Sequence, residues 1–137
     1  NLGVIDYDQD KVEVTLNIRY PKGISFEHIC QTIEEKVSPF GFAAHVYHHQ
    51  KLLYENPESD LVKTLLNVYI KHTNEVDAKP ISIGGGTFAR AMKNSVAFGP
   101  HFLDKPTFIH QKNEFIDLDD LLKATVIYTE ALYELAK

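Results

Sequence analysis

The residues from Lys11 to Tyr20 alternate strictly between apolar and polar side chains. A β-strand points successive side chains to opposite faces, so this alternation predicts a half-buried strand with one polar face. The apolar face would carry Val12, Val14, Leu16, Ile18 and Tyr20, and the polar face Glu13, Thr15, Asn17 and Arg19. Arg19 would then lie at the surface of a sheet.

A helix and a second strand are expected after this segment. Residues 21–23 predict a turn, and Ser25 can cap a helix whose apolar side chains recur at helical spacing. These side chains are Phe26, Ile29, Cys30, Ile33 and Val37, before Pro39 and Gly41 end the helix. Residues 42–51 predict another strand. The segment 11–51 is therefore interpreted as strand, helix, strand, with parallel strands if both join one sheet.

The remaining residues predict two longer helices separated by short strands. A domain boundary is placed just before residues 56–58, which predict the start of a helix with Leu61, Leu65, Val68 and His72 on one face. Short apolar runs predict strands at 79–83, 95–98 and 107–109. The last helix is expected to start after Asp117, because acidic residues suit the positive end of a helix. Its predicted buried stripe is Leu118, Leu121, Leu122, Thr125, Leu132 and Leu135.

The composition excludes several classes of protein. With 137 residues, 44% of them hydrophobic, the chain can bury a core. A net charge of -5 without a basic stripe argues against nucleic acid, and no apolar run reaches the ~20 residues that cross a bilayer. One cysteine, Cys30, excludes a disulfide framework and fits a buried thiol in the cytoplasm. Because the chain starts at Asn1 and its only methionine is Met92, it is expected to be part of something longer.

A run of three glycines is the first stretch that can carry chemistry. Gly84, Gly85 and Gly86 precede Thr87, and glycine lets a backbone approach a ligand closely. Gly84, Gly86 and Ala89 also satisfy the loose G-x-G-x-x-A pattern of dinucleotide sites. Such a site needs a long helix after Ala89, whereas only residues 87–93 precede the next strand signal. A functional loop is expected here, with nucleotide binding as an alternative.

Histidine and arginine supply the other candidate site residues. His45 and His49 are four apart, a spacing that brings metal ligands together on a helix but not on the predicted strand. His110 ends a short apolar run and precedes a loop, where α/β proteins place ligands and catalytic groups. Arg19 can bind a carboxylate through two hydrogen bonds. By position alone, solvated side chains remain the alternative for both His110 and Arg19.

Several segments together resemble one enzyme family. Residues 83–94 read Ile-Gly-Gly-Gly-Thr-Phe-Ala-Arg-Ala-Met-Lys-Asn, residues 96–99 Val-Ala-Phe-Gly, residues 110–114 His-Gln-Lys-Asn-Glu and residues 121–125 Leu-Leu-Lys-Ala-Thr. In this order they resemble the end of the catalytic domain in M20 metallopeptidases of the bacterial PepV type, the Xaa-His dipeptidases. The segment 11–51, marked by Asn-Ile-Arg-Tyr-Pro at 17–21, is similar to the second half of the family's lid domain.

The resemblance implies an α/β fold in two parts. Residues 1–55 would form the C-terminal half of a strand-helix-strand lid domain, and residues 56–137 the C-terminal, mixed α/β portion of a zinc-peptidase catalytic domain. His110 would be the last protein ligand of one of two zinc ions, with manganese or cobalt as alternatives, and Glu114 or a backbone carbonyl would orient its ring. The implied substrate-binding residues are Arg19, for the C-terminal carboxylate, Gly84, Gly85, Gly86 and Thr87, for the part near the metals, and Arg90, in support.

The resemblance also implies a reaction and what this chain lacks for it. In such enzymes a glutamate base activates a water between two zinc ions, and this water attacks the peptide carbonyl. The family's other ligands and the base lie upstream, and residues 1–10 do not supply them. We therefore expect a cytoplasmic dipeptidase whose partners are the dipeptide and the missing N-terminal part, while this chain alone is inactive and self-associates. The alternative is a non-enzymatic binding or dimerisation module that pairs through an exposed sheet edge.

Overall fold

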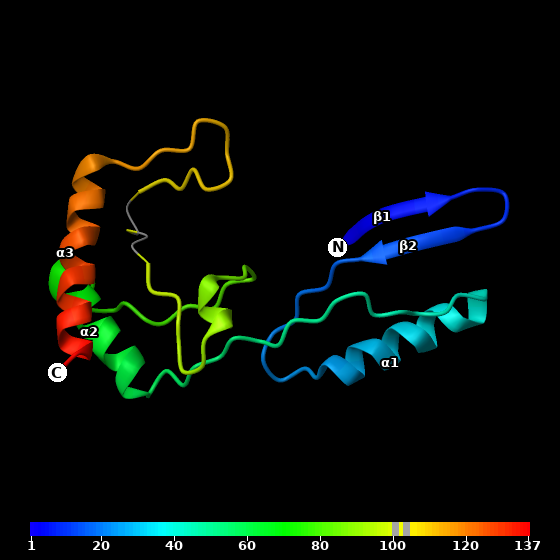
Figure 1. Cartoon of the computed structure of the whole chain (residues 1–137), viewed down its shortest axis with the longest axis horizontal. Helices are drawn as coiled ribbons and strands as arrows, with labels where there is room; N and C mark the ends of the chain where they lie inside the picture. The colour runs from blue at the N-terminus through cyan, green and yellow to red at the C-terminus, as the bar shows by residue number, and fades with distance from the viewer. Residues whose placement is uncertain (100–101, 103–104) are drawn as a thin grey trace. The chain divides into compact units, whose positions relative to one another are not determined.

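The computed structural model describes residues 1–99, 102 and 105–137. The chain divides into two compact units, residues 1–52 and 53–137 (Figure 1). Over the described residues the structure is mixed α/β, with one two-stranded sheet and three α-helices. No helix among these residues is long and apolar enough to cross a membrane.

The first unit opens with a β-hairpin. Strands β1 (Leu2–Tyr7) and β2 (Val12–Leu16) pair antiparallel. Asp8 closes the turn between them, because its carboxylate Oδ1 accepts hydrogen bonds of 2.8 Å from the backbone N–H groups of Asp10 and Lys11. The sequence pattern did not predict β1, so the strand that pairs with β2 is a finding of the structure.

In β2 the predicted apolar face is exposed and the predicted polar face is partly covered. Its apolar residues Val12 and Val14 are 51% and 41% exposed. Glu13 on the polar face is half-buried, and its Oε1 accepts a hydrogen bond of 2.7 Å from the Tyr47 hydroxyl. The prediction of a buried apolar face is wrong for the described residues, because alternation decides which side chains share a face but not which face is covered.

Helix α1 (Phe26–Val37) is confirmed, together with its cap. The Ser25 Oγ accepts a hydrogen bond of 3.1 Å from the backbone N–H of His28. The predicted apolar stripe is the shielded side of the helix, although Cys30 is half-buried rather than fully buried. A short 3-10 helix, η1 (Ser38–Phe40), follows.

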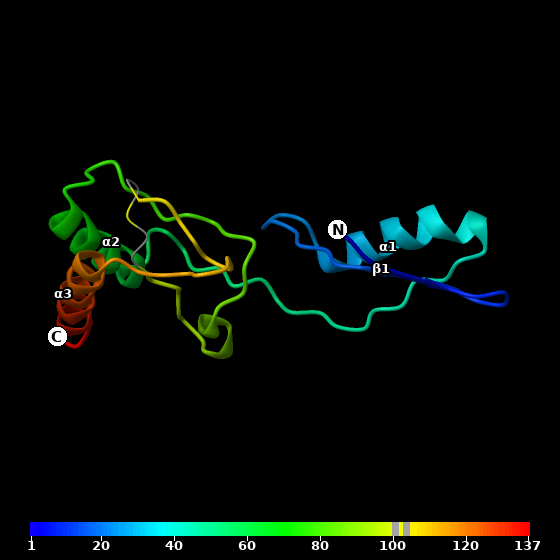
Figure 2. The ribbon, with the colours of Figure 1, turned by 90° about the horizontal axis from the view of Figure 1, so that it is seen from above.

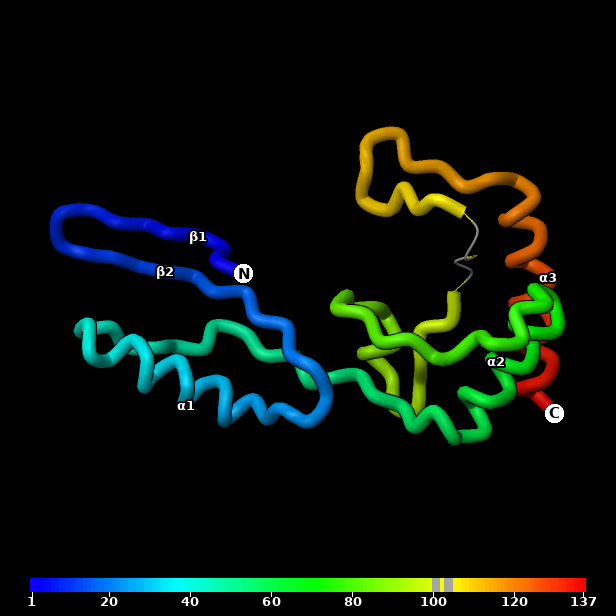
Figure 3. The backbone as a smooth tube through the Cα atoms, turned by 180° about the vertical axis from the view of Figure 1, so that it is seen from behind, coloured from blue at the N-terminus to red at the C-terminus, as the bar shows by residue number. Residues whose placement is uncertain are grey.

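Residues 42–51 form no strand, which corrects the predicted strand-helix-strand unit. The segment is joined to α1 by the Ala44 N–H, which donates to Glu34 Oε2 at 2.8 Å, and to β2 by Tyr47. Figure 3 follows its backbone beside α1. A strand needs a neighbour whose backbone groups can pair with it, and the described partner of β2 is β1. The observed order in this unit is strand, strand, helix.

The second unit is built on two helices, α2 (Asp60–Thr73) and α3 (Leu118–Leu135), which lie side by side in Figures 1 and 2. The core between them contains Leu65, Val68, Phe102, Ile127 and Ala131. Ser59 caps α2, so residues 56–58 form a turn before the helix rather than its first turn. The predicted inner face of α2 is confirmed at Leu65 and Val68.

Helix α3 starts after Asp117 as predicted, but it buries a different face. The Asp119 N–H donates to Asp117 Oδ1 at 2.9 Å. The buried residues are Ala124, Ile127 and Ala131, whereas the predicted stripe is exposed. Its exposed fractions are Leu118 73%, Leu121 45%, Leu122 66%, Leu132 70% and Leu135 44%, and Thr125 is exposed as well. Ile127 and Ala131 pack with Leu65 and Val68 of α2, so this face meets the neighbouring helix and the leucine stripe does not. Apolar periodicity shows which side chains share a face, but the neighbouring element decides which face is buried.

The three short strands predicted in this unit, at 79–83, 95–98 and 107–109, are irregular in the structure. The described residues between α2 and α3 contain one 3-10 helix, η2 (Phe88–Ala91). The apolar run 95–98 packs through side chains, since the Phe98 ring meets the Tyr128 ring edge-on at 5.9 Å. An apolar run alone cannot distinguish a strand from another buried segment, because strand formation depends on a pairing neighbour.

Glu130 joins the two helices of this unit. Its carboxylate accepts hydrogen bonds from Lys71 Nζ at 2.5 Å and from His72 Nε2 at 2.6 Å. The hydrogen bond from Lys71, followed by that from His72, holds the pKa of Glu130 below its ordinary value of 4.5. A carboxylate with a lowered folded-state pKa stabilises the fold above its unfolded pKa, and this contribution is lost as the pH falls through the folded value.

We therefore expect Glu130→Gln to lower the melting temperature at about pH 7, and expect the difference from the unchanged chain to disappear by about pH 3. Thermal unfolding followed by circular dichroism at both pH values measures this. Glu134→Gln is the control, because Glu134 pairs with Lys137 near the exposed end of the chain and such pairs contribute little. An equal loss at both pH values would show that Glu130 acts through packing instead of charge.

Candidate functional site

The glycine loop of residues 84–86 and Arg90, which lies in the short helix η2, form one local arrangement. A Cβ placed on Gly86 would lie 3.4 Å from Nη1 of Arg90, so the absent side chain leaves room for the guanidinium. The loop leads into η2. The Ser95 hydroxyl donates a hydrogen bond of 2.6 Å to the Ala89 carbonyl and so holds η2 to the segment that follows it. The structure thus brings together Gly86 and Arg90, two residues to which the sequence resemblance assigned substrate binding.

Thr87 adds a polar atom to this arrangement. Its Oγ1 is buried and has no hydrogen-bond partner within the part of the chain that the structure describes. A buried hydroxyl without a partner is costly, so such groups in native proteins call for a partner from elsewhere. Phe88, the next residue, is instead almost fully exposed. The loop therefore combines an exposed apolar ring with an unsatisfied hydroxyl and a guanidinium.

The structure removes the nucleotide-binding alternative for this loop. Dinucleotide sites place the phosphates at the start of a helix that runs for several turns. Here the glycine run is followed by η2, which is a 3-10 helix of four residues. A helix of four residues is too short to provide the N-terminal phosphate site that such proteins use.

His110 lies in a loop of its own. Its backbone has φ 61°, in the left-handed region, and its N–H donates to Glu114 Oε2 at 3.4 Å. The rings of Phe108 and Phe115, 4.6 Å apart, close the base of this loop. Glu114 was one of two predicted partners for the imidazole, beside a backbone carbonyl; in the structure its Oε2 accepts the hydrogen bond from the backbone of His110. The side chain of His110 is exposed.

The donors among the described residues do not form a complete metal centre. Among residues 1–99, 102 and 105–137 no three His, Cys, Asp or Glu side chains are grouped so that they could hold a metal ion. A structural zinc site has four protein ligands and a catalytic one three. His110 can supply one nitrogen donor, so these residues alone do not build the metal site that the sequence resemblance implies.

Arg19 belongs to the first unit, and Gly84–Thr87, Arg90 and His110 belong to the second. Since β2 ends at Leu16, Arg19 follows the strand in an irregular segment, which corrects its predicted place on the strand. Its side chain is exposed.

One histidine contact was not foreseen. His49 Nε2 lies 2.6 Å from the Tyr20 hydroxyl, and the His49 ring stacks on Phe26. The sequence interpretation placed His49 on the predicted strand of residues 42–51 or at its end, partly exposed. Tyr20 and His49 are 29 positions apart, and no local sequence pattern indicates that they are in contact.

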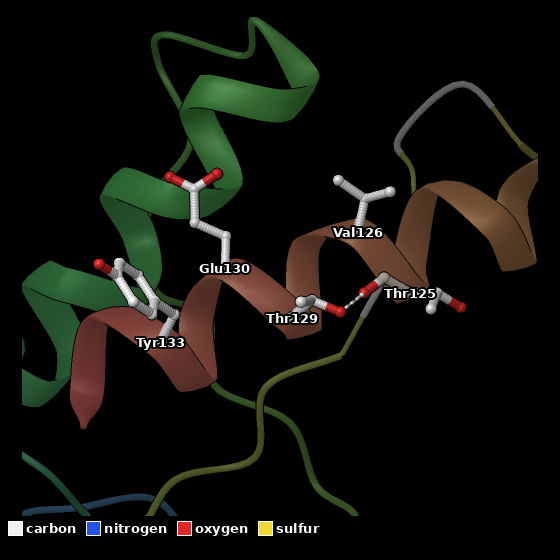
Figure 4. Close-up of a pocket in the computed structure, with 5 residues that line it drawn as sticks. All are labelled: Thr125, Val126, Thr129, Glu130 and Tyr133. Carbon is white, nitrogen blue, oxygen red and sulfur yellow. Dashed lines mark hydrogen bonds between the residues drawn. The ribbon is translucent and has the colours of Figure 1, made fainter.

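A groove on the outer side of α3 does not coincide with the predicted site. It is lined by Thr125, Val126, Thr129, Glu130 and Tyr133 (Figure 4). Glu130 points toward α2, where Lys71 and His72 bind it, and the Thr129 hydroxyl donates to the Thr125 carbonyl. These polar groups are already engaged, so the groove offers mainly an apolar surface.

Comparison with known proteins connects these features. The model of peptidase family M20/M25/M40 matches residues 9–134. A protein of Staphylococcus epidermidis named "Putative dipeptidase" is 40% identical over 136 residues, which is 98% of this chain. Proteins of the same name from Staphylococcus saprophyticus and Staphylococcus aureus are 38% identical over the same length. The chain spans 29% of the length of each of these relatives.

Proposed function

Since the chain belongs to peptidase family M20/M25/M40, we propose that it is the C-terminal part of a dipeptidase. The observation that carries this proposal is the similarity of 98% of the chain to proteins named as dipeptidases. Members of the family are generally metal-dependent. The finer assignment, a zinc enzyme of the PepV type that hydrolyses Xaa-His dipeptides, rests on the motifs around Gly84–Thr87 and His110.

In this proposal residues 1–55 belong to a lid domain and residues 56–137 to a catalytic domain. Arg19 binds the C-terminal carboxylate of the dipeptide, because its guanidinium can donate two parallel hydrogen bonds to it. The backbone N–H groups of Gly84–Thr87 and the buried Thr87 hydroxyl hold the substrate beside the reacting peptide bond. Arg90, which lies against Gly86, supports this loop.

His110 contributes one imidazole to the metal site, with zinc as the proposed metal and manganese or cobalt as alternatives. The other ligands and the general base are proposed to come from the part of the enzyme outside this chain, since the relatives are more than three times as long. That part would also cover the outward leucines of α3, such as Leu122 and Leu132. The half-buried thiol of Cys30 suits a reducing compartment, and the cytoplasm is the proposed location.

A second candidate is a non-enzymatic binding or dimerisation module. It is favoured by the apolar residues that β1 and β2 expose, including Val4, Ile5 and Val12. An exposed strand edge with apolar side chains is a template for pairing with another copy. This candidate predicts a stable dimer of the 137-residue chain at micromolar concentration and no peptidase activity in any longer protein.

The deciding experiment compares the purified chain with the longer natural protein that contains it. Hydrolysis of a Xaa-His dipeptide is measured for each, with and without a chelator, and sedimentation gives the association state. We expect chelator-sensitive hydrolysis by the longer protein and none by the chain alone. A longer protein that contains the full family domain, is loaded with metal and hydrolyses no dipeptide would contradict the proposed function.

A further inference from the structure

A histidine outside the predicted site joins both ends of the turn that follows Arg19. The Nε2 of His49 lies 2.6 Å from the Tyr20 hydroxyl. The same imidazole stacks on the Phe26 ring, with 3.7 Å between ring centroids and 13° between ring planes. Tyr20 and Phe26 bracket the turn of residues 21–25, so one side chain is in contact with the residue before the turn and the residue after it.

This segment has little backbone structure of its own. Residues 17–25 lie between β2 and α1 and belong to neither a helix nor a strand. Within the turn, Gly23 has φ 100° and the Ile24 N–H reaches the Pro21 carbonyl at 3.5 Å, which is a long hydrogen bond. Segments with few backbone hydrogen bonds open readily, so side-chain contacts determine how well this one is ordered.

We propose that His49 is a positioning residue that holds Arg19 in place for carboxylate binding. The inference rests on the proposed function, in which Arg19 binds the substrate. Two parallel hydrogen bonds to a carboxylate require a guanidinium held at a defined place and angle. Arg19 directly precedes Tyr20, and the bond between Tyr20 and His49 restrains the backbone at that point. His49 acts through Tyr20 and Phe26 and does not itself contact the substrate.

The first test needs no enzymatic activity. Nuclear magnetic relaxation of the ¹⁵N-labelled chain reports the order of backbone amides at residues 19–24. His49→Ala is expected to lower the order of these amides markedly, whereas His48→Ala, which alters the neighbouring histidine that makes neither contact, leaves it unchanged. His49→Phe keeps the stacking surface and loses the hydrogen bond, and Tyr20→Phe removes the same hydrogen bond from the other side, so both should give intermediate values. Unchanged order in His49→Ala would overturn the inference whether or not the protein is a dipeptidase.

The second test uses the longer enzyme. His49→Ala should raise the KM for a dipeptide about fivefold to tenfold and leave kcat within about twofold, as expected for a binding contact that is the same in the ground state and the transition state. For the corresponding dipeptide amide, which lacks the carboxylate, KM should not respond to the substitution. A fall in kcat with unchanged KM, or the same change for both substrates, would overturn the positioning role. If Arg19→Ala raises KM for the dipeptide but not for its amide, whereas His49→Ala leaves both KM values unchanged, the proposed function remains and the role of His49 is overturned.

Discussion

Replacement of His110 by alanine in the longer enzyme should lower kcat/KM about 1000-fold. A bound metal ion supplies several kcal/mol of transition-state stabilisation, and each 1.4 kcal/mol corresponds to a factor of ten in rate. If His110 is one of the metal ligands, the variant should also contain about one metal ion fewer per chain by elemental analysis, which is a readout independent of turnover. In the 137-residue chain His110 is exposed, so there its replacement should change the melting temperature little.

Two matched variants make this result specific. His110 has φ 61°, and asparagine adopts left-handed backbone more readily than alanine does. His110→Asn should therefore preserve the loop and still lose activity. Lys112→Ala changes an exposed residue of the same loop and should keep kcat/KM within about twofold. Full metal content and full activity in His110→Asn would remove His110 from the metal site without affecting the family assignment.

Replacement of Ile127 by alanine should destabilise the second unit by about 2–5 kcal/mol. Ile127 is 1% exposed and lies in the core with Leu65, Val68 and Phe102. Truncating a fully buried isoleucine loses its transfer free energy and leaves a cavity. Urea unfolding of the 137-residue chain, followed by the circular dichroism of its helices, measures the change. Domains typically have a free energy of unfolding of about 5–15 kcal/mol, so a loss of this size would clearly shift the unfolding midpoint.

Leu122→Ala on the outer side of the same helix is the control. Leu122 is 66% exposed, so in the 137-residue chain its truncation should change the free energy of unfolding by no more than about 0.5 kcal/mol. In the longer protein the same substitution should cost about 2 kcal/mol or more, because the proposed fold covers this face. A negligible effect in both proteins would mean that the face remains exposed, and a large effect in the chain alone would indicate that copies of the chain associate through it.

The features that the sequence predicted well depend on near neighbours along the chain. Ser25 and Asp117 cap their helices because a side-chain oxygen two or three residues away from a backbone N–H can reach it in any context. The same local logic accounts for the inner face of α2 at Leu65 and Val68. The order of motifs from Gly84 to Glu114 led to the family, which the match of the family model over residues 9–134 confirms.

The larger features that were predicted wrongly depend on residues distant in the sequence. The apolar face of β2 and the leucine face of α3 could be recognised as apolar, but which side is covered depends on what packs against it. Residues 42–51 have the composition of a strand and make side-chain contacts instead, because backbone pairing needs a partner at the right place. The contact of His49 with Tyr20 joins residues 29 positions apart, and no local rule indicates it.

The sequence by itself thus determined where α1 and α3 begin, which side chains share a face, and to which family the motifs belong. Only the tertiary structure decided that β1 pairs with β2, that the alanine face of α3 packs on α2, and that His49 lies between Tyr20 and Phe26. The physical reason is that caps and periodicity arise from interactions within one or two turns of chain, whereas pairing and burial require two distant segments to meet.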